Sequence, residues 1–190
     1  QYPDPVLRMK AREVTGFDHA LATLAARMVH VMQKARGVGL AAPQLGVLQR
    51  VLVHQADEDR EPAVLVNPVI VSSSAEVDTL EEGCLSLDAA GVTVEVVRPV
   101  AITVEARGVV GEALRIEAEG LEARVIQHEV DHLEGVLIID RAAPDQRMIL
   151  FRYPARTGGI LLGAAVATAI TVNALYLQDG NHPAPMFSTR

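Results

Sequence analysis

The sequence predicts one α+β domain in which antiparallel β-sheets surround a central helix, with another helix near the N-terminus and a helical C-terminal tail. A length of 190 residues suits a single domain with one sizeable hydrophobic core. Short segments of β-type composition lie between two segments with helical periodicity, and this order is typical of α+β proteins. A long uncharged stretch sets the tail apart from the rest of the chain.

The N-terminal helix is predicted over residues 18–36. Asp18 can cap its first turn, and Gly37 ends it. The apolar positions that recur at helical spacing are Leu21, Leu24, Met28, Val31, Met32 and Ala35. We expect His19 and His30 on this helix to be ordinary surface or boundary residues.

The middle of the chain is predicted to form short strands and then the central helix. Residues 37–46 come first, and their Gly and Pro content favours a loop. The expected strands are Val51–Val53, Ala63–Val66, Val92–Val97, Val100–Ala106 and Ala113–Glu117. The last two flank a turn that contains Gly108 and Gly111, which favours a hairpin. The central helix is expected over Leu121–Glu134, with a glycine on each side.

The C-terminal tail differs from the rest in composition. Residues 157–178 contain no charged side chain, and a stretch of this length could span a bilayer. Ala, Gly, Thr and Asn dilute its hydrophobicity, however, so a packed or partner-bound helix is favoured and membrane insertion is not expected. We therefore expect a catalytic-type domain over residues 1–156 and an atypical apolar helix with a loose end over residues 157–190.

Charge and cysteine content limit the possible partners and compartments. The net charge is -7, which argues against a general DNA or RNA binder, since such proteins usually carry a basic face. The single cysteine, Cys84, excludes an internal disulfide and makes a reducing cytoplasm the default expectation. No signal peptide is visible. The chain begins with Gln1, so an upstream targeting segment and an organellar location stay open.

The strongest chemical signal lies on the central helix, in the stretch from Gln127 to His132. His128 and His132 are four residues apart, so on a helix they share a face and can bind one metal ion. Glu129 lies beside that position, where it can accept a proton from the attacking water. This pattern is typical of metallohydrolases that cleave amide-type bonds. The alternative is a charged helix whose two histidines face solvent.

Two histidines leave such a site incomplete, because a catalytic metal site usually has three protein ligands and one open position. Downstream candidates are poor: His182 lies in the loose tail, and Glu134 points to another face of the helix. Cys84 is the better third ligand, since a nearby cation stabilises its thiolate, and Gly83 lets the backbone approach closely. The alternative is that Cys84 is a small buried apolar residue.

Three stretches together resemble the signature motifs of the peptide deformylase family. They are residues 37–44 (GVGLAAPQ), 82–86 (EGCLS) and 127–132 (QHEVDH), and residues 2–7 are similar to the usual beginning of the family. The resemblance covers about residues 2–141. It implies an enzyme that removes the formyl group from the N-terminal formyl-methionine of newly made proteins. It also implies one divalent metal ion, typically Fe²⁺ in cells with Zn²⁺, Ni²⁺ or Co²⁺ as substitutes, because the spacing alone does not name the metal.

The resemblance also implies roles for individual residues. The metal ligands would be Cys84, His128 and His132. Glu129 would take a proton from water and pass it to the departing amine, which releases formate. The oxyanion would be stabilised by the side-chain amide of Gln44 and the backbone N–H of Leu85.

Substrate binding calls for an apolar pocket and a place for the peptide backbone. Val38, Leu121 and Val125 are the candidates for the methionine pocket, and the alternative is that they belong to the core. The peptide is expected to pair as an added strand with backbone around Gly39 and Gly83, which would let one enzyme accept many proteins.

Three supporting residues are expected near the ligands. Glu82 and Arg98 are expected to form an ion pair. Asp131 is expected to orient a ligand histidine or a neighbouring basic group, and the alternative is a solvated carboxylate.

Two features depart from the family pattern. Residues 87–91 stand where the family often has a proline, so the resemblance does not give the shape of one wall of the pocket. The tail lacks the charge that helps many members contact the ribosome, so a transient ribosome contact depends on a modest basic patch formed by Arg141, Arg147, Arg152 and Arg156.

Two other functions remain to be weighed. The first is a related metallo-amidase or peptidase, or a deformylase paralogue with an altered substrate. The second is a metal-stabilised binding module without catalysis.

Overall fold

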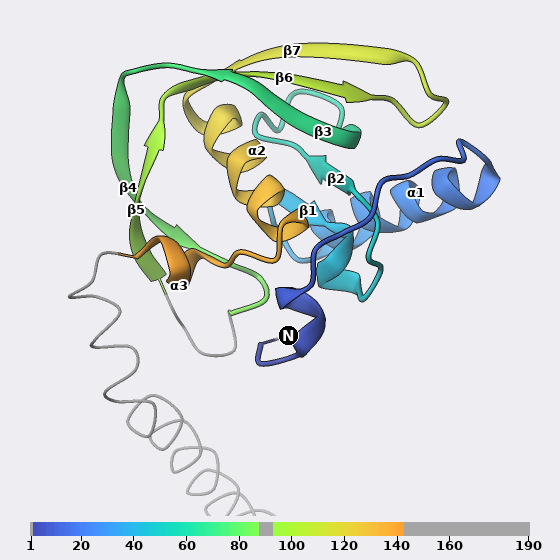
Figure 1. Cartoon of the computed structure of the whole chain (residues 1–190), viewed down its shortest axis with the longest axis horizontal. Coiled ribbons are helices and arrows are strands. Elements are labelled where there is room, and N and C mark those ends of the chain that lie inside the picture. Colours follow the sequence, from blue (N-terminus) through green and yellow to red (C-terminus); the bar gives the residue numbers. More distant parts are fainter. Residues whose placement is uncertain (1, 88–92, 143–190) are drawn as a thin grey trace, which may run out of the picture. The chain divides into compact units, whose positions relative to one another are not determined.

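Seven strands and two long helices carry the fold in the computed structural model, which describes residues 2–87 and 93–142 (Figure 1). The helical elements are η1 (Pro5–Arg8), α1 (His19–Lys34), η2 (Ala42–Leu45), α2 (Gly120–Leu133) and α3 (Ile138–Arg141). The strands are β1 (Gly39–Ala41), β2 (Val51–His54), β3 (Ala63–Ser73), β4 (Val77–Gly83), β5 (Thr93–Pro99), β6 (Ala101–Arg107) and β7 (Ala113–Glu119).

The strands form two antiparallel sheets. One has five strands in the order β1-β2-β3-β6-β7, and the other pairs β4 with β5. The short strand β1 is an edge of the larger sheet, and its residue Gly39 lies opposite His54 of β2. In Figure 1, α2 lies in the middle of the molecule, and it contacts strands of both sheets. The expected fold class is confirmed.

Two helices cover opposite faces of β2, which explains why all four of its residues are buried. Val51 and Val53 pack in a cluster with Met28 and Met32 of α1. Leu52 points the other way and packs with residues of α2, as the two-residue period of a strand requires. The α2 helix is therefore held against a buried strand.

The structure corrects several boundaries predicted from the sequence. The segment 37–46 was expected to be a loop, but it contains β1 and the short helix η2, because Gly39 to Ala41 find partners on β2. Strand β3 extends to Ser73, and β4 was not expected at all. Most of β4 is exposed and polar, so it lacks the apolar alternation that marks a half-buried strand. The four-residue helix α3 is too short to show a helical period.

The tail predictions lie outside the described residues. These include the boundary at residue 156, the apolar helix over residues 157–178 and three arginines of the basic patch, Arg147, Arg152 and Arg156. Within the described residues, no helix combines the length and the apolar character needed to cross a membrane.

Candidate metal centre

Cys84, His128 and His132 come together from two distant parts of the chain. Cys84 follows the last residue of β4, and the two histidines lie one turn apart on α2. Their ligand atoms all lie within 4.8 Å of one another. The Cys84 Sγ is 3.3 Å from the His132 Nε2, and the two imidazole rings meet edge to face with centroids 5.0 Å apart. One thiol and two imidazoles therefore face a common point.

The two imidazoles differ in how their surroundings affect protonation. Burial lowers the pKa of His132 to about 3, so its ring stays neutral and keeps a lone pair for a ligand. Burial also works against a charge on His128, but hydrogen bonds to Cys84 and Glu82 and the charge of Glu129 raise its pKa to about 10. The surroundings of His128 thus favour positive charge, and a divalent ion held there would supply that charge in place of the proton.

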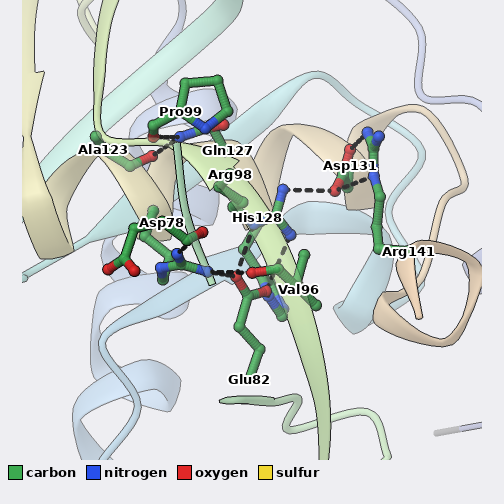
Figure 2. Close-up of polar contacts among 11 residues, drawn as sticks. Asp78, Glu82, Val96, Arg98, Pro99, Ala123, Gln127, His128, Asp131 and Arg141 are labelled. Carbon is green, nitrogen blue, oxygen red and sulfur yellow. Dashed lines mark hydrogen bonds and ion pairs between the residues drawn. The ribbon is translucent and has the colours of Figure 1, made fainter. Parts of the chain in front are cut away.

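Glu82 fixes the orientation of His128 (Figure 2). Its Oε2 lies 3.0 Å from the His128 Nδ1, which leaves the Nε2 of that ring free to face Cys84. Arg98 binds both oxygens of Glu82, at 2.7 and 2.9 Å, and Arg124 donates to one of them at 2.7 Å. Burial would raise the pKa of Glu82, but the bonds to His128, Arg98 and Arg124 lower it to about 2. Glu82 is therefore ionised at neutral pH. The expected ion pair between Glu82 and Arg98 is present.

Asp131 continues this network on the other side of Arg98 (Figure 2). It accepts a hydrogen bond of 2.9 Å from Arg98 and bonds of 3.1 and 2.5 Å from Arg141. Asp131 is only 8% exposed, so the alternative of a solvated carboxylate is wrong. Its partners are basic groups, and it acts on His128 only through Arg98 and Glu82. Arg141 is thus partly neutralised and contributes less to a basic patch than expected.

Glu129 is buried beside the cluster and faces the backbone of Gly39. One of its oxygens, Oε2, has no hydrogen-bond partner among the described residues. Burial raises the pKa of Glu129 to about 7, against the charges of His128 and Arg98, which lower it. A Cβ at position 39 would lie 2.4 Å from the other oxygen of Glu129, so only glycine permits this approach. A carboxyl group with such a pKa can both accept and release a proton near neutral pH.

Gln44 and Leu85 lie on the thiol side of the cluster. The Gln44 side chain is held by its oxygen, which accepts a 2.7 Å hydrogen bond from the Ala41 N–H. Its amide nitrogen points toward Ser86 Oγ at 3.1 Å and Cys84 Sγ at 3.9 Å. The backbone N–H of Leu85 donates to none of the described residues. Two N–H donors therefore lie next to the ligand cluster.

A cavity of about 470 Å³ opens onto these groups. All five residues expected to bind substrate line it, namely Val38, Gly39, Gly83, Leu121 and Val125. Val38 and Leu121 are 46% and 54% exposed, whereas Val125 is 5% exposed. For Val38 and Leu121, membership of the core is therefore excluded, and exposed apolar side chains in a cavity are suited to an apolar ligand.

Sequence reasoning missed four polar residues of the cavity wall. They are Arg36, Glu81, Thr93 and Arg124. Arg124 lies four residues before His128 and on the same side of α2, so the helical period alone could have placed it near Glu82. No comparable signal marks the other three, because they depend on how β4, β5 and the end of α1 meet.

Comparisons with known proteins relate most of the chain to one family. The family model described as polypeptide deformylase matches residues 1–148. A peptide deformylase of Desulforudis audaxviator is 46% identical over 142 residues, which cover 75% of this chain and 90% of that protein. The solved structure of the peptide deformylase of Thermotoga maritima is 44% identical, with a TM-score of 0.71, and covers 75% of this chain and 95% of its own. That of Legionella pneumophila gives 41% identity, a TM-score of 0.75 and coverage of 85% and 94%.

Proposed function

Since the chain belongs to the polypeptide deformylase family, whose members remove the formyl group from nascent peptides, we propose that Cys84, His128 and His132 hold its metal ion and that Glu129 transfers its protons. The enzyme is a metal-dependent hydrolase. The observation that carries the assignment of residues is the convergence of one thiol and two imidazoles within 4.8 Å, beside a buried carboxyl group.

The three donor groups fit a single divalent ion. Thiolate and imidazole suit the borderline metals, and we infer Fe²⁺ as the resident ion, with Zn²⁺, Ni²⁺ or Co²⁺ able to replace it. When bound, the ion acts as a Lewis acid that polarises the formyl oxygen and makes water more acidic. Glu82 supports this role because it fixes the tautomer of His128 and directs the Nε2 lone pair toward the site.

Glu129 is the proton carrier of the reaction. Its unpartnered Oε2 can accept the proton of the attacking water, and burial, which raises the pKa of this carboxyl group, favours holding that proton until the amine leaves. The same oxygen then donates to the departing nitrogen, so formate and a free N-terminus are formed. Because both proton steps depend on one group, we expect its removal to be more damaging than the loss of an oxyanion donor.

Gln44 and Leu85 stabilise the oxyanion that develops on the formyl group. The Gln44 amide nitrogen and the Leu85 N–H are donors beside Cys84, and the bond from Ala41 N–H to Gln44 fixes the direction of that amide. Preorganised donors of this kind stabilise the transition state more than the bound substrate. Loss of one donor costs about 3 kcal/mol of barrier.

The substrate peptide adds a strand to the free edge of β1. This edge carries Gly39, which lines the cavity, and Gly83 at the end of β4 lines the same cavity. The methionine side chain contacts Val38, Leu121 and Val125. Main-chain pairing accepts any sequence beyond the methionine, so it suits an enzyme that must process many nascent proteins.

The substrate determines the cellular compartment in which the enzyme acts. Formylated nascent chains are available where translation takes place, so we infer action in the cytoplasm of a bacterium, with transient contact to the ribosome. A missing upstream targeting segment would move the same reaction to an organelle.

The decisive test is formate release from formyl-Met-Ala by anaerobically purified protein, with metal content measured in the same sample. We expect one metal ion per chain and formate in proportion to the metal. Metal-loaded protein that releases no formate would overturn the proposed function.

A further inference from the structure

The N-terminal segment of residues 2–11 contacts all three segments that carry the site residues, and we call it the N-terminal strap. It contains η1, which contacts η2, the short helix that carries Gln44 (Figure 1). One end of the strap bonds to the turn after β4, where Cys84 and Leu85 lie. The other end bonds to the last residue of α2, directly after His132. The strap therefore links the segments of the proposed metal ligands and oxyanion donors.

The second half of the strap lies on the end of α2. The Ala11 N–H donates a 2.8 Å hydrogen bond to the carbonyl oxygen of Leu133. A Cβ at Gly135 would lie 2.6 Å from the carbonyl oxygen of Arg8, so only glycine allows the strap to pass this close. Arg8 also forms an ion pair with Asp140 of α3. These contacts fix the strap relative to the helix that carries the two ligand histidines.

The first half of the strap holds the turn that contains Cys84 and Leu85. A 2.8 Å hydrogen bond from the Leu87 N–H to the Cys84 carbonyl oxygen closes this turn. The Tyr2 N–H donates to the carbonyl oxygen of Ser86, inside the turn, at 3.0 Å. Ser86 is only 6% exposed, so this bond is shielded from water. The strap is therefore tied to the turn two peptide units beyond the Leu85 N–H.

Hydrophobic packing explains only the second half of the strap. Leu7 and Ala11 are buried, and Ala11 belongs to the core cluster that includes residues of α2. In contrast, Tyr2 is 44% exposed, and residues 3–5 are exposed as well. Ordering these residues costs conformational entropy, which so little burial does not offset. The bond from Tyr2 to Ser86 thus points to a role of this half in the site instead of in the core.

The direction of the Leu85 N–H matters for the proposed reaction. An oxyanion donor stabilises the transition state only when it points at the place where the charge develops. A displacement of about 1 Å, caused by a substitution away from the reacting atoms, can lower the rate by about a hundredfold. A turn that is tied at Ser86 resists such a displacement, because its own closing bond and the bond from Tyr2 act together.

We propose that the Tyr2 N–H is a positioning group for deformylation, which holds the Leu85 N–H toward the formyl oxygen through its bond to Ser86. This inference rests on the proposed function. Any residue with a backbone N–H serves at position 2, since the side chain of Tyr2 takes no part in the bond. Gln44 is directed separately, by the Ala41 N–H. The strap therefore acts on kcat more than on KM or on metal binding.

The test compares Tyr2→Pro, which lacks the N–H, with Tyr2→Ala, which keeps it. With formyl-Met-Ala, we expect kcat to fall by about tenfold to a hundredfold in Tyr2→Pro, while KM and metal content change by less than about twofold. Tyr2→Ala is the matched control, and its kcat should stay within about twofold of wild type because it retains the bond to Ser86.

A nuclear magnetic resonance signal reports on the Leu85 N–H alone. Cys84 is the single cysteine of this chain. Labelling cysteine at its carbonyl carbon and leucine at its nitrogen therefore gives one cross-peak, from the peptide group between Cys84 and Leu85. In Zn²⁺-loaded protein this peak should shift in Tyr2→Pro and stay in place in Tyr2→Ala. A strap that only stabilised the core would leave the peak where it is in both variants.

Three results would overturn the inference. They are an unchanged kcat in Tyr2→Pro, an equal loss in Tyr2→Ala, or a loss of kcat in Tyr2→Pro without a shift of the Leu85 peak. If circular dichroism shows that Tyr2→Pro does not fold, the hydroxy-acid analogue of tyrosine at position 2 removes the N–H without a proline ring, and the same criteria apply. Equal formate release by wild type and Tyr2→Pro removes this inference alone, whereas no formate from wild type removes the proposed function.

Discussion

Two buried histidines, one near each end of α2, differ in their hydrogen bonding. At the C-terminal end, the Nδ1 of His128 is bonded to Glu82, which Arg98 and Arg124 hold in turn. At the N-terminal end, His54 lies against Glu122 and makes no hydrogen bond to any described residue. A partnered ring is oriented and can serve as a ligand with a fixed direction. Among the described residues, the His54 ring is held by packing alone, and both of its nitrogens are closed off from solvent.

The two ends of α2 also differ in how firmly the surrounding chain holds them. The network around Glu82 joins β4, β5 and α2, so it connects the strand that leads to Cys84 with the helix that carries both histidines. At the N-terminal end of α2, a second cavity has one wall from the segment that follows β2, and such segments vary more easily than a core. The candidate metal centre therefore lies at the firmly held end of α2, and the other end borders a segment that can vary.

The largest effect is expected from Cys84→Ala, which removes the one sulfur ligand. The variant should lose both the metal ion and formate release, because two imidazoles alone bind such an ion weakly. Alanine is small and suits this buried position, so the fold should persist. Metal analysis and circular dichroism on the same sample check this expectation. A variant that keeps its metal would remove Cys84 from the ligand set.

Glu129→Gln should separate metal binding from catalysis. We expect about a thousandfold loss of kcat, since both proton transfers fail, while metal content stays at the wild-type level. The amide has the shape of the carboxyl group, so the close contact with Gly39 is kept. Activity within tenfold of wild type would show that another group carries the proton.

Gln44→Leu should lower kcat by about a hundredfold and change KM little, because an oxyanion donor acts mainly in the transition state. The control is Ser86→Ala, which removes the 3.1 Å partner of the Gln44 amide without removing the donor. Steady-state kinetics with formyl-Met-Ala measure both variants. An equal loss in the two would mean that Gln44 acts through Ser86 instead of on the substrate.

Arg98→Met should weaken the metal site indirectly. Without Arg98, Glu82 loses two hydrogen bonds and holds His128 less firmly, so affinity for Zn²⁺ should fall by about tenfold to a hundredfold in a chelator competition. The free energy of unfolding should fall by about 3 kcal/mol, because Asp131 and Glu82 are left buried with fewer partners. Arg115→Met breaks an exposed pair with Glu105, and as the control it should change neither quantity.

The smallest effect is expected at the other end of the helix, from His54→Phe. Burial holds the pKa of His54 below its ordinary value of 6.5, so the unfolded chain takes up a proton there before the folded one does. The stability that comes from neutral His54 is present above pH 6.5 and is lost as the pH falls below it. The variant should therefore lose less stability than wild type between pH 7 and pH 5, as urea titrations can measure. Equal slopes would show that His54 is not held neutral by the fold.

The proposed ligand set could be named from the sequence because its signals are local. His128 and His132 are spaced by one helical turn, and Cys84 lies in a short stretch that resembles a family motif. Glu82 and Arg98 were expected as a pair, and the structure contains that pair. The expectations for Cys84, His128 and His132 needed only a helix period and a motif of a few residues.

The remaining features depend on contacts between distant parts of the chain. The strand β4 has a polar sequence, so only its partner β5 shows that it is a strand. The bond between Asp131 and Arg141 requires the turn that α3 makes after α2. His54 follows a predicted strand, but its burial requires α2 to pack over it, and no sequence period expresses that contact.

The central claim is that one sulfur and two imidazole nitrogens share a single ion. X-ray absorption at the K-edge of the metal in anaerobically purified protein tests this most directly. The expected spectrum contains one sulfur neighbour at about 2.3 Å and two imidazole nitrogens at about 2.0–2.1 Å. A spectrum without a sulfur neighbour would contradict the account, because the metal would then lie away from Cys84.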